Sequence, residues 1–409
     1  MSKRLPTKFR VILLGIALSA LGNGLVLPYL FIYLHNIRGI SSALAGLIVG
    51  YGALASLAIS PLVGNMIDHW GPKPVLLISL LVSAVGYSAW GLVNHPYQAF
   101  VVITICSFGQ SAMWPAQNAI ATELTPDHLR ERAYGSSFAI LNLGLGVGGL
   151  ISSLVVSLKD PHSFQHLFVG DGFSFLLYFL VVLTLRNVGH RNKAERAANK
   201  ELEGGWKDVI ADRIFVKFWL VSLAAIFFGY SQLEVGFAAF STSIARQPPA
   251  HIAWAYAANT LVIATCQLWV IKRIEKLARA KAMAIATVLW MGSWIALSLA
   301  GLISGLGLAM VILCQVIFAF GEMFWSPVVP SIVNQLAPAH LRGRYNAASS
   351  NAWQIALVMG PTMAGTLLGA GLHWLWIALL VTGLFVVTVL ALRLKLPSRV
   401  VDPASVVNP

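Results

Sequence analysis

The sequence predicts an all-α polytopic membrane protein with twelve transmembrane helices, arranged as two pseudo-symmetric halves of six helices each. Three observations predict this fold class. Hydrophobic residues make up 57% of the 409 residues and charged residues only 11%, whereas a soluble domain carries about a quarter charged residues. Uncharged stretches long enough to cross a bilayer recur along the whole chain. One polar sequence also occurs twice, half a chain apart.

Each predicted span is an almost uncharged run of about 20 residues, the length that a helix needs to cross the hydrocarbon core. The runs follow one another too closely for a soluble domain to lie between them. We place the spans at 11–34, 42–63, 74–93, 97–122, 134–157, 167–186, 215–240, 251–271, 282–301, 307–333, 346–370 and 374–392. Each half of the chain contributes six of them.

The expected organisation is an N-terminal six-helix bundle over 1–186, a cytoplasmic linker over 187–213, a C-terminal six-helix bundle over 214–394 and a cytoplasmic tail over 395–409. The linker is rich in Arg, Lys, Glu and Asn, a composition that would also allow a surface helix. A plain connection between the two bundles is favoured there over a regulatory or partner-binding site.

A sequence at the end of the fourth span returns at the end of the tenth span. The first copy extends from Phe108 to Arg132 and the second from Phe320 to Arg344, with no gap, and both end in the pattern Leu-x-Pro-x-His-Leu-Arg-x-Arg. A duplicated membrane unit is typical of secondary transporters, whose substrate sites lie between the repeats. The repeat therefore favours a transporter.

The net charge of +13 is explained by topology. With both termini in the cytoplasm, every Lys and Arg except Arg38, Lys159 and Arg246 falls on a cytoplasmic segment. This distribution follows the positive-inside rule, so it indicates a multi-pass protein of the cytoplasmic membrane rather than one that binds nucleic acid. The His and Cys residues have no metal-ligand spacing, and we predict no metal and no other cofactor.

The connection between the second and third spans has the features of a tight cytoplasmic turn. Gly64 and Gly71 suit a close helix approach and an open backbone conformation. Asp68 can accept hydrogen bonds from a neighbouring helix N-terminus, and Lys73 can reach an acid or a lipid phosphate. The whole connection reads Gly64-Asn65-Met66-Ile67-Asp68-His69-Trp70-Gly71-Pro72-Lys73.

This loop resembles the Gly-x-x-x-Asp-x-x-Gly-Arg-Lys loop of the major facilitator superfamily. The resemblance implies the fold of that family and a gating role, in which the loop latches the outward-open state by pairing its Arg with an acid at the end of the fourth span. Glu123 stands at the position of that acid, while Pro72 replaces the Arg. A pair between Lys73 and Glu123 is the substitute that this sequence offers.

Within the superfamily the chain is similar to the twelve-span drug:proton antiporter group. The fifth span resembles the antiporter motif of that group, and the eleventh span carries an equivalent Gly-Pro pair. Small residues at such spacings let helices approach closely and bend, so plain helix packing is the alternative to a role in alternating access. The residues concerned are Asn142, Gly144, Gly146, Gly148 and Gly149 in the fifth span, with Gly360 and Pro361 in the eleventh.

Three acids fall inside predicted spans, namely Asp171, Glu234 and Glu322, whereas no Lys or Arg falls near the middle of any span. A carboxylate in hydrocarbon costs several kcal/mol, so such groups face the bundle interior and need a neutralising partner. Because the spans offer no cation, we expect the partner to be a proton, an inorganic cation or a cationic substrate.

Glu322 is the leading candidate for proton or substrate binding. Trp325 lies on the same helix face, and Gln110 with Trp114 occupies the equivalent place in the first copy. We expect the two copies to line opposite walls of one cavity, where a carboxylate and indole rings would attract a lipophilic cation. The alternative is that Glu322 is a protonated packing residue.

The other two acids lie nearer the outer ends of their spans. Glu234 shares a helix face with Tyr230, and an interfacial position facing extracellular water is the alternative to a role in coupling. Asp171 lies only four residues into its predicted span, so solvation or helix capping at the outer end is favoured over function.

These features predict a proton-coupled exporter of small amphipathic or cationic compounds, similar to multidrug efflux proteins. It would use the proton motive force, work by alternating access and act as a monomer, with a small-molecule substrate and protons as partners. One alternative is an exporter or uniporter of a sugar, an amino acid or a lipid-like metabolite. A non-transporting receptor on the same fold is a second, and an enzyme is disfavoured because no nucleophile, metal site or acid pair is placed for catalysis.

Overall fold

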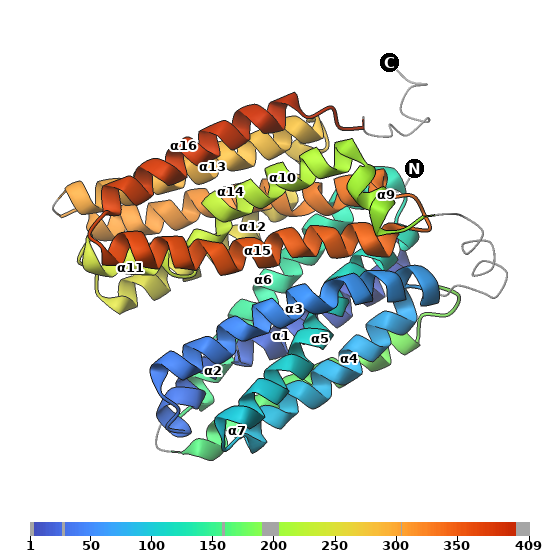
Figure 1. Cartoon of the computed structure of the whole chain (residues 1–409), viewed down its shortest axis with the longest axis horizontal. Coiled ribbons are helices and arrows are strands. Elements are labelled where there is room, and N and C mark those ends of the chain that lie inside the picture. Colours follow the sequence, from blue (N-terminus) through green and yellow to red (C-terminus); the bar gives the residue numbers. More distant parts are fainter. Residues whose placement is uncertain (1–3, 27–28, 158–159, 190–203, 304, 398–409) are drawn as a thin grey trace. The chain divides into compact units, whose positions relative to one another are not determined.

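The computed structural model describes residues 4–26, 29–157, 160–189, 204–303 and 305–397, and within them the regular structure is helical apart from one isolated bridge between Ser157 and Asp160 (Figure 1). The all-α prediction is therefore confirmed. The central part of the predicted linker, 190–203, and the end of the predicted tail, 398–409, lie outside the described residues.

The chain divides into two compact units. The first consists of Met1–Lys207 together with Ala337–Asn351, and the second of Asp208–Leu336 together with Ala352–Pro409. The first unit thus reaches into the predicted linker and includes the end of the second sequence repeat. One long helix, α15 (Arg342–Gly369), begins in the first unit and continues in the second.

Six long helices form the first unit. They are α1 (Thr7–Val26), α3 (Ser42–Trp70), α4 (Pro72–Ala89), α5 (Pro96–Leu124), α6 (Arg130–Val155) and α7 (Pro161–Leu183). Short helical turns connect them, namely α2 (Leu30–Ile32), η1 (Tyr33–Ile37), η2 (Trp90–Leu92) and η3 (Asp127–Leu129). The short helix α9 (Trp206–Ala211) lies near the end of the predicted linker and crosses the boundary between the units.

The second unit begins with a more broken series of helices. It contains α10 (Arg213–Phe228), η4 (Tyr230–Leu233), α11 (Gly236–Ser243), α12 (Pro249–Ile274), α13 (Arg279–Leu302), α14 (Gly307–Leu336), the remainder of α15, and α16 (His373–Arg393). Eleven segments of the described chain are long and apolar enough to cross a membrane. Helix α15 is long enough but richer in small and polar residues. The multi-pass prediction is confirmed, while the count of twelve spans and the cytoplasmic position of the termini stay predictions.

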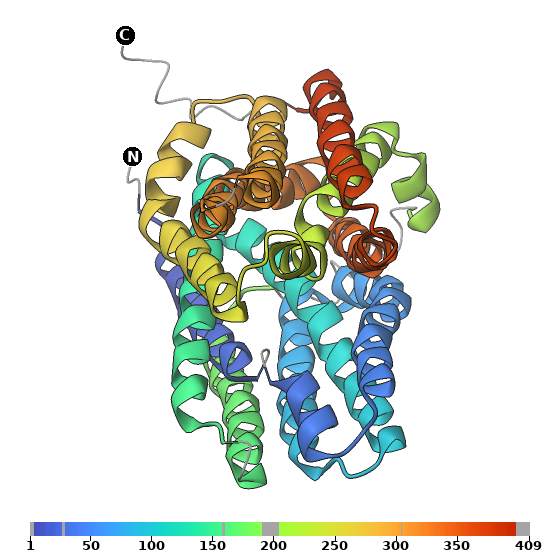
Figure 2. The ribbon, with the colours of Figure 1, turned by 90° about the vertical axis from the view of Figure 1, so that its left-hand side faces the viewer.

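Four contacts between helices of the first unit have counterparts in the second unit (Figures 1 and 2). In the first unit α4 packs against α5 and α7, α5 packs against α3, and α7 packs against α1. In the second unit α13 packs against α14 and α16, α14 packs against α12, and α16 packs against α10. The sequence duplication is therefore reproduced in the packing of the helices.

Small residues allow α6 to lie directly against α1. A Cβ added to Gly144 would lie 2.6 Å from the Cβ of Ala20, and one added to Gly148 would collide with the carbonyl oxygen of Leu21. These two glycines lie one helical turn apart, the spacing that brings membrane helices into close contact. Helix packing accounts for these two glycines, and a role in alternating access stays a prediction.

The seventh predicted span, 215–240, is not one continuous helix. It breaks at Gly229, whose φ of −102° and ψ of −92° end α10. The carbonyl of Phe227, freed by the break, accepts hydrogen bonds from the side chains of Ser231 at 2.9 Å and Gln232 at 2.8 Å. The carbonyl of Phe228 accepts one from the indole of Trp294 at 3.1 Å. Irregular backbone at membrane depth requires such internal partners, and sequence periodicity alone did not reveal the break.

We expect Gly148→Val to destabilise the protein, because its side chain would force α6 away from α1. Overpacking of this kind costs about 1–3 kcal/mol. Gly149→Val is the matched control, since a Cβ there would meet only the carbonyl oxygen of Gly24, at 3.9 Å. Thermal unfolding of the purified variants in detergent checks this prediction. Equal melting temperatures for the two variants would contradict it.

Candidate functional site

The Glu322 carboxyl lies at mid-length of α14 and is 4% exposed. The side-chain amide of Asn259 on α12 donates to its Oε2 at 2.8 Å and also lies 3.2 Å from Oε1 of Gln315. Tyr230 in η4 lies next to the carboxyl and interacts with it electrostatically. Among the described residues no Lys or Arg pairs with it. The acid is thus held by neutral groups from three elements of one unit.

Aromatic rings surround the Tyr230 side of this site. The Tyr230 ring lies 4.5 Å from that of Trp353 on α15 and 6.0 Å from that of Phe318 on α14. Both Tyr230 and Trp353 are half-buried. Trp325, the predicted aromatic neighbour, is instead 4% exposed and packs against Trp290 of α13 at 5.3 Å, within the bundle core.

Sequence reasoning missed Asn259, Gln315 and Trp353. None carries a charge; Asn259 and Gln315 lie in otherwise apolar runs, and Trp353 follows a polar stretch. A side-chain amide within a predicted span is a weak sign of a polar site, because an amide in a membrane span needs an internal partner just as a carboxyl does. A search for buried amides as well as acids would have found Asn259 and Gln315.

Glu234 differs from Glu322 in its surroundings. It follows η4 directly, before α11 begins, and its side chain is exposed. Tyr256 of α12 donates its hydroxyl to the neighbouring carbonyl of Leu233 at 2.8 Å, which holds this stretch against α12. The exposure agrees with the alternative of a solvated acid, while its position next to the break places it on the same irregular segment as Tyr230.

Asp171 is not an outer-end residue, contrary to the sequence prediction. Helix α7 begins at Pro161, earlier than expected, and the Asp171 side chain is 0% exposed. Its Oδ1 accepts a hydrogen bond from the Ser174 hydroxyl at 3.3 Å, while its Oδ2 has no hydrogen-bond partner among the described residues. A Cβ on Gly22 of α1 would collide with the carboxyl. Asp171 is thus a buried acid within the first unit.

Gln110 and Trp114 on α5 also belong to the first unit. The Gln110 amide donates to the hydroxyl of Tyr87 on α4 at 2.9 Å, and Trp114 is 38% exposed. The cavity that these residues were expected to share with Glu322 stays a prediction. Within the described part of the chain, no group of three His, Cys, Asp or Glu side chains is placed to hold a metal ion.

The turn between α3 and α4 follows the sequence expectation. Gly71 has a φ of 92°, a conformation that favours glycine because a Cβ would be strained there. Pro72 then begins α4, where its missing N–H is no loss because the first amides of a helix lack intrahelical acceptors. The turn fixes the direction of the last residues of α3, including Asp68.

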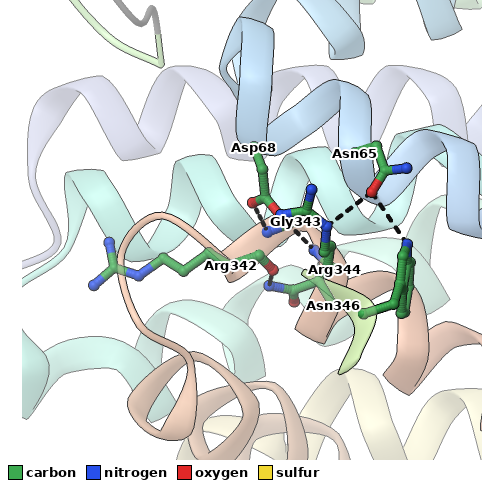
Figure 3. Close-up of polar contacts among 7 residues, drawn as sticks. Asn65, Asp68, Arg342, Gly343, Arg344 and Asn346 are labelled. Carbon is green, nitrogen blue, oxygen red and sulfur yellow. Dashed lines mark hydrogen bonds and ion pairs between the residues drawn. The ribbon is translucent and has the colours of Figure 1, made fainter. Parts of the chain in front are cut away.

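Asp68 caps the start of α15 (Figure 3). Its Oδ1 accepts from the backbone amide of Gly343 at 2.5 Å, and its Oδ2 accepts from the backbone amide and from Nη1 of Arg344, each at 3.2 Å. Nε of Arg344 also donates to Oδ1 of Asn65 at 2.8 Å. The predicted partnership of Asp68 with a helix N-terminus is therefore confirmed. We call Asn65, Asp68, Gly343 and Arg344 the α3–α15 clasp.

Two glycines bring α3 and α15 close enough for these bonds. A Cβ on Gly64 would lie 3.0 Å from the Cβ of Ala347, and one on Gly343 would lie 2.7 Å from the Cβ of Ile67 and 2.8 Å from Oδ1 of Asp68. The first sequence copy has Glu131 at the position of Gly343. The two copies of the turn therefore differ at the position where the clasp requires a glycine.

The substitute pair of Lys73 and Glu123 is not formed. Lys73 donates from Nζ to the carbonyl of Leu185 and from its backbone amide to the carbonyl of Gly189 at 2.9 Å. Glu123 accepts from the amide of Gly189 at 2.9 Å. Both side chains thus hold the chain that follows α7. Sequence reasoning missed these partners because they are backbone groups.

The chain resembles known transporters in both sequence and fold. The sequence pattern of the Major Facilitator Superfamily matches residues 12–246. An uncharacterized MFS-type transporter of Bacillus subtilis, YttB, is 26% identical over 92% of this chain and 92% of its own. The quinolone resistance protein NorA of Staphylococcus aureus is 25% identical over 65% of this chain and 66% of its own.

A solved structure shows the same fold. The bacterial homologue of the iron transporter ferroportin, in an outward-facing state, superposes with a TM-score of 0.75 at 14% identity, covering 95% of this chain and 99% of that one. Since the family pattern alone covers more than half of the chain, the protein is a multi-pass membrane transporter rather than an enzyme, and it belongs to the major facilitator superfamily.

Proposed function

We propose that the protein is a proton-coupled exporter of small amphipathic or cationic compounds, located in the cytoplasmic membrane and active as a monomer by alternating access. The observation that carries the proposal is the Glu322 carboxyl, which is buried at mid-helix, accepts a hydrogen bond from Asn259 and lies next to Tyr230, without a cationic partner among the described residues. A transporter has no structural need to bury an acid in this way.

Two neutralising partners are chemically available to Glu322, and they exclude each other. An uncompensated charge in a low-dielectric interior costs several kcal/mol. A proton removes the charge, and a cationic cargo balances it. The carboxyl therefore binds one or the other, which is the requirement for antiport. Each net charge that follows the membrane potential gains about 2.3 kcal/mol per 100 mV.

The aromatic side chains support an amphipathic cargo. Tyr230 and Trp353 are half-buried with their rings 4.5 Å apart, and aromatic faces attract organic cations as well as apolar surface. The related NorA is described as a quinolone resistance protein, which agrees with export of amphipathic aromatic compounds. A neutral metabolite would not need the carboxyl.

The remaining acids take secondary places in this proposal. Glu234 lies on the irregular segment after the break in the seventh span, where discontinuous helices of other transporters form their ion and substrate sites. Asp171 is a second buried carboxyl that could hold a proton, within the first unit.

The α3–α15 clasp is proposed to act as the latch that must open and re-form during each cycle.

We expect Glu322→Gln to slow the pH-gradient-driven efflux of a lipophilic cation such as ethidium from proteoliposomes. The rate should fall by at least about tenfold, which corresponds to about 1.4 kcal/mol of lost coupling. The amide keeps the shape of the side chain but cannot release a proton. Gradient-independent binding of the same dye, followed by fluorescence, should weaken as well, because the neutral amide cannot balance the charge of the cation. If Glu322→Gln left gradient-driven efflux intact, the coupling role would be wrong, and a uniporter of neutral compounds would become the better assignment.

Glu234→Gln should have a smaller effect in the same assay, a decrease of no more than about threefold, which is less than about 0.7 kcal/mol. Its side chain is exposed, unlike that of Glu322, so we expect removal of its charge to relieve a smaller burial cost. Comparison of the two variants at equal protein density in the liposomes measures the difference. An equal or larger loss for Glu234→Gln would show that the main coupling acid has been misassigned.

Gly343→Ala should weaken the clasp, because the methyl group would occupy space now taken by Ile67 and Asp68. Hydrogen bonds to a charged acceptor contribute about 1.5–3 kcal/mol each, so partial loss should slow transport by at least about tenfold. Gly365→Ala is the matched control on the same helix, where a Cβ would meet nothing within 4 Å. Efflux rates in proteoliposomes check this; identical rates for the two variants would argue against a role of the clasp.

A further inference from the structure

The chain that enters the second unit is attached to the clasp. The indole Nε1 of Trp206 donates to Oδ1 of Asn65 at 3.1 Å. Just before it, Gly204 lies against the second sequence repeat, since a Cβ there would be 3.0 Å from Nε2 of His340 and 3.5 Å from Leu341. All of these residues belong to the first compact unit.

Asn65 is the point where two donors meet. Its Oδ1 accepts from Nε of Arg344 at 2.8 Å and from Nε1 of Trp206 at 3.1 Å. An amide oxygen has two lone pairs, so these two bonds satisfy it completely. The Trp206 bond restricts the rotation of the Asn65 side chain and so keeps the oxygen directed at Arg344.

The chain that follows α7, at the other described end of the linker, is also held by side chains of the first unit. Lys73 binds the carbonyls of Leu185 and Gly189, and Glu123 accepts from the amide of Gly189. Residues of the Gly64–Lys73 connection therefore contact both described ends of the linker, since Lys73 binds Leu185 and Gly189 while Asn65 binds Trp206. The plain-connection interpretation of the linker does not account for this double attachment.

We propose that Trp206 is a positioning residue of the α3–α15 clasp, and that the end of the linker is released when the clasp opens. In this scheme Trp206 acts through Asn65 on Arg344, and it touches neither the cargo nor Glu322. The linker then stabilises one conformation of the transport cycle. This goes beyond the proposed function and does not depend on the identity of the cargo.

Hydrogen–deuterium exchange of the full chain in lipid nanodiscs tests the proposal without any cargo. Peptides that cover Gly343 and Arg344 report on the clasp, because Asp68 protects both amides. Trp206→Phe keeps a ring but removes the N–H, and exchange of these peptides should become about fivefold faster, as expected for the loss of one neutral hydrogen bond. Trp70→Phe is the matched control, since Trp70 ends α3 and is 38% exposed; its exchange should equal that of the unmodified protein.

Variants of Asn65 separate positioning from a general loss of stability. Asn65→Asp keeps an acceptor oxygen for both donors and should leave the peptides protected. Asn65→Leu removes the acceptor and should give at least the acceleration seen for Trp206→Phe. In the Asn65→Leu background, Trp206→Phe should then add nothing, because its partner is already gone. Unchanged exchange in Trp206→Phe, or accelerations that multiply in the double variant, would overturn the proposal.

Discussion

Lipid offers no hydrogen bonds to a peptide group, and the structure depends on this constraint more than on any single contact. It forces the chain into helices, and it requires that every irregularity be satisfied from within. The break at Gly229 is possible because the side chains of Ser231 and Gln232 take the free carbonyl of Phe227, and because Trp294 takes that of Phe228. The same constraint makes an acid such as Glu322 costly unless neighbouring groups or a ligand compensate it.

Much of the fold could be predicted from the sequence because hydrophobic length and charge placement are local properties. Most predicted spans coincide with a long helix, and the turn at Gly71 and the helix-capping role of Asp68 followed from residue chemistry. Other features depend on contacts between segments that are distant in the sequence. The partners of Lys73 are backbone carbonyls, and the neighbours of Tyr230 include Trp353, more than a hundred residues away. No local pattern encodes such pairings.

The candidate site was found only in part for the same reason. A carboxyl in an apolar run is conspicuous, so Glu322 and Asp171 were noticed. The position of Asp171 was nevertheless wrong, because α7 begins at Pro161 in a polar stretch that hydropathy does not include in a span. The residues that hold Glu322, above all Asn259, carry no charge and attract no attention in a sequence. Side-chain amides form the supporting structure of this site.

The duplicated halves have kept their packing and diverged in their polar groups. Several pairs of equivalent helices contact each other in both units. In the sequence repeat, however, Gln110 occupies the position equivalent to Glu322, and Glu131 occupies the position equivalent to Gly343. Packing is retained because any change in it affects many neighbours at once. A polar side chain at a helix surface can change alone, and the second copy carries both the Glu322 carboxyl and the glycine that the clasp needs.

Helix α15 belongs to both compact units, and its continuity has a mechanical consequence. Arg344 of the clasp and Trp353 beside Tyr230 lie on the same uninterrupted helix, nine residues or about 14 Å apart along its axis. An α-helix without a proline in this stretch is stiff, since Pro361 comes only later. The clasp residue Arg344 and the ring beside Tyr230 therefore belong to one stiff stretch of helix, although the compact units divide between them.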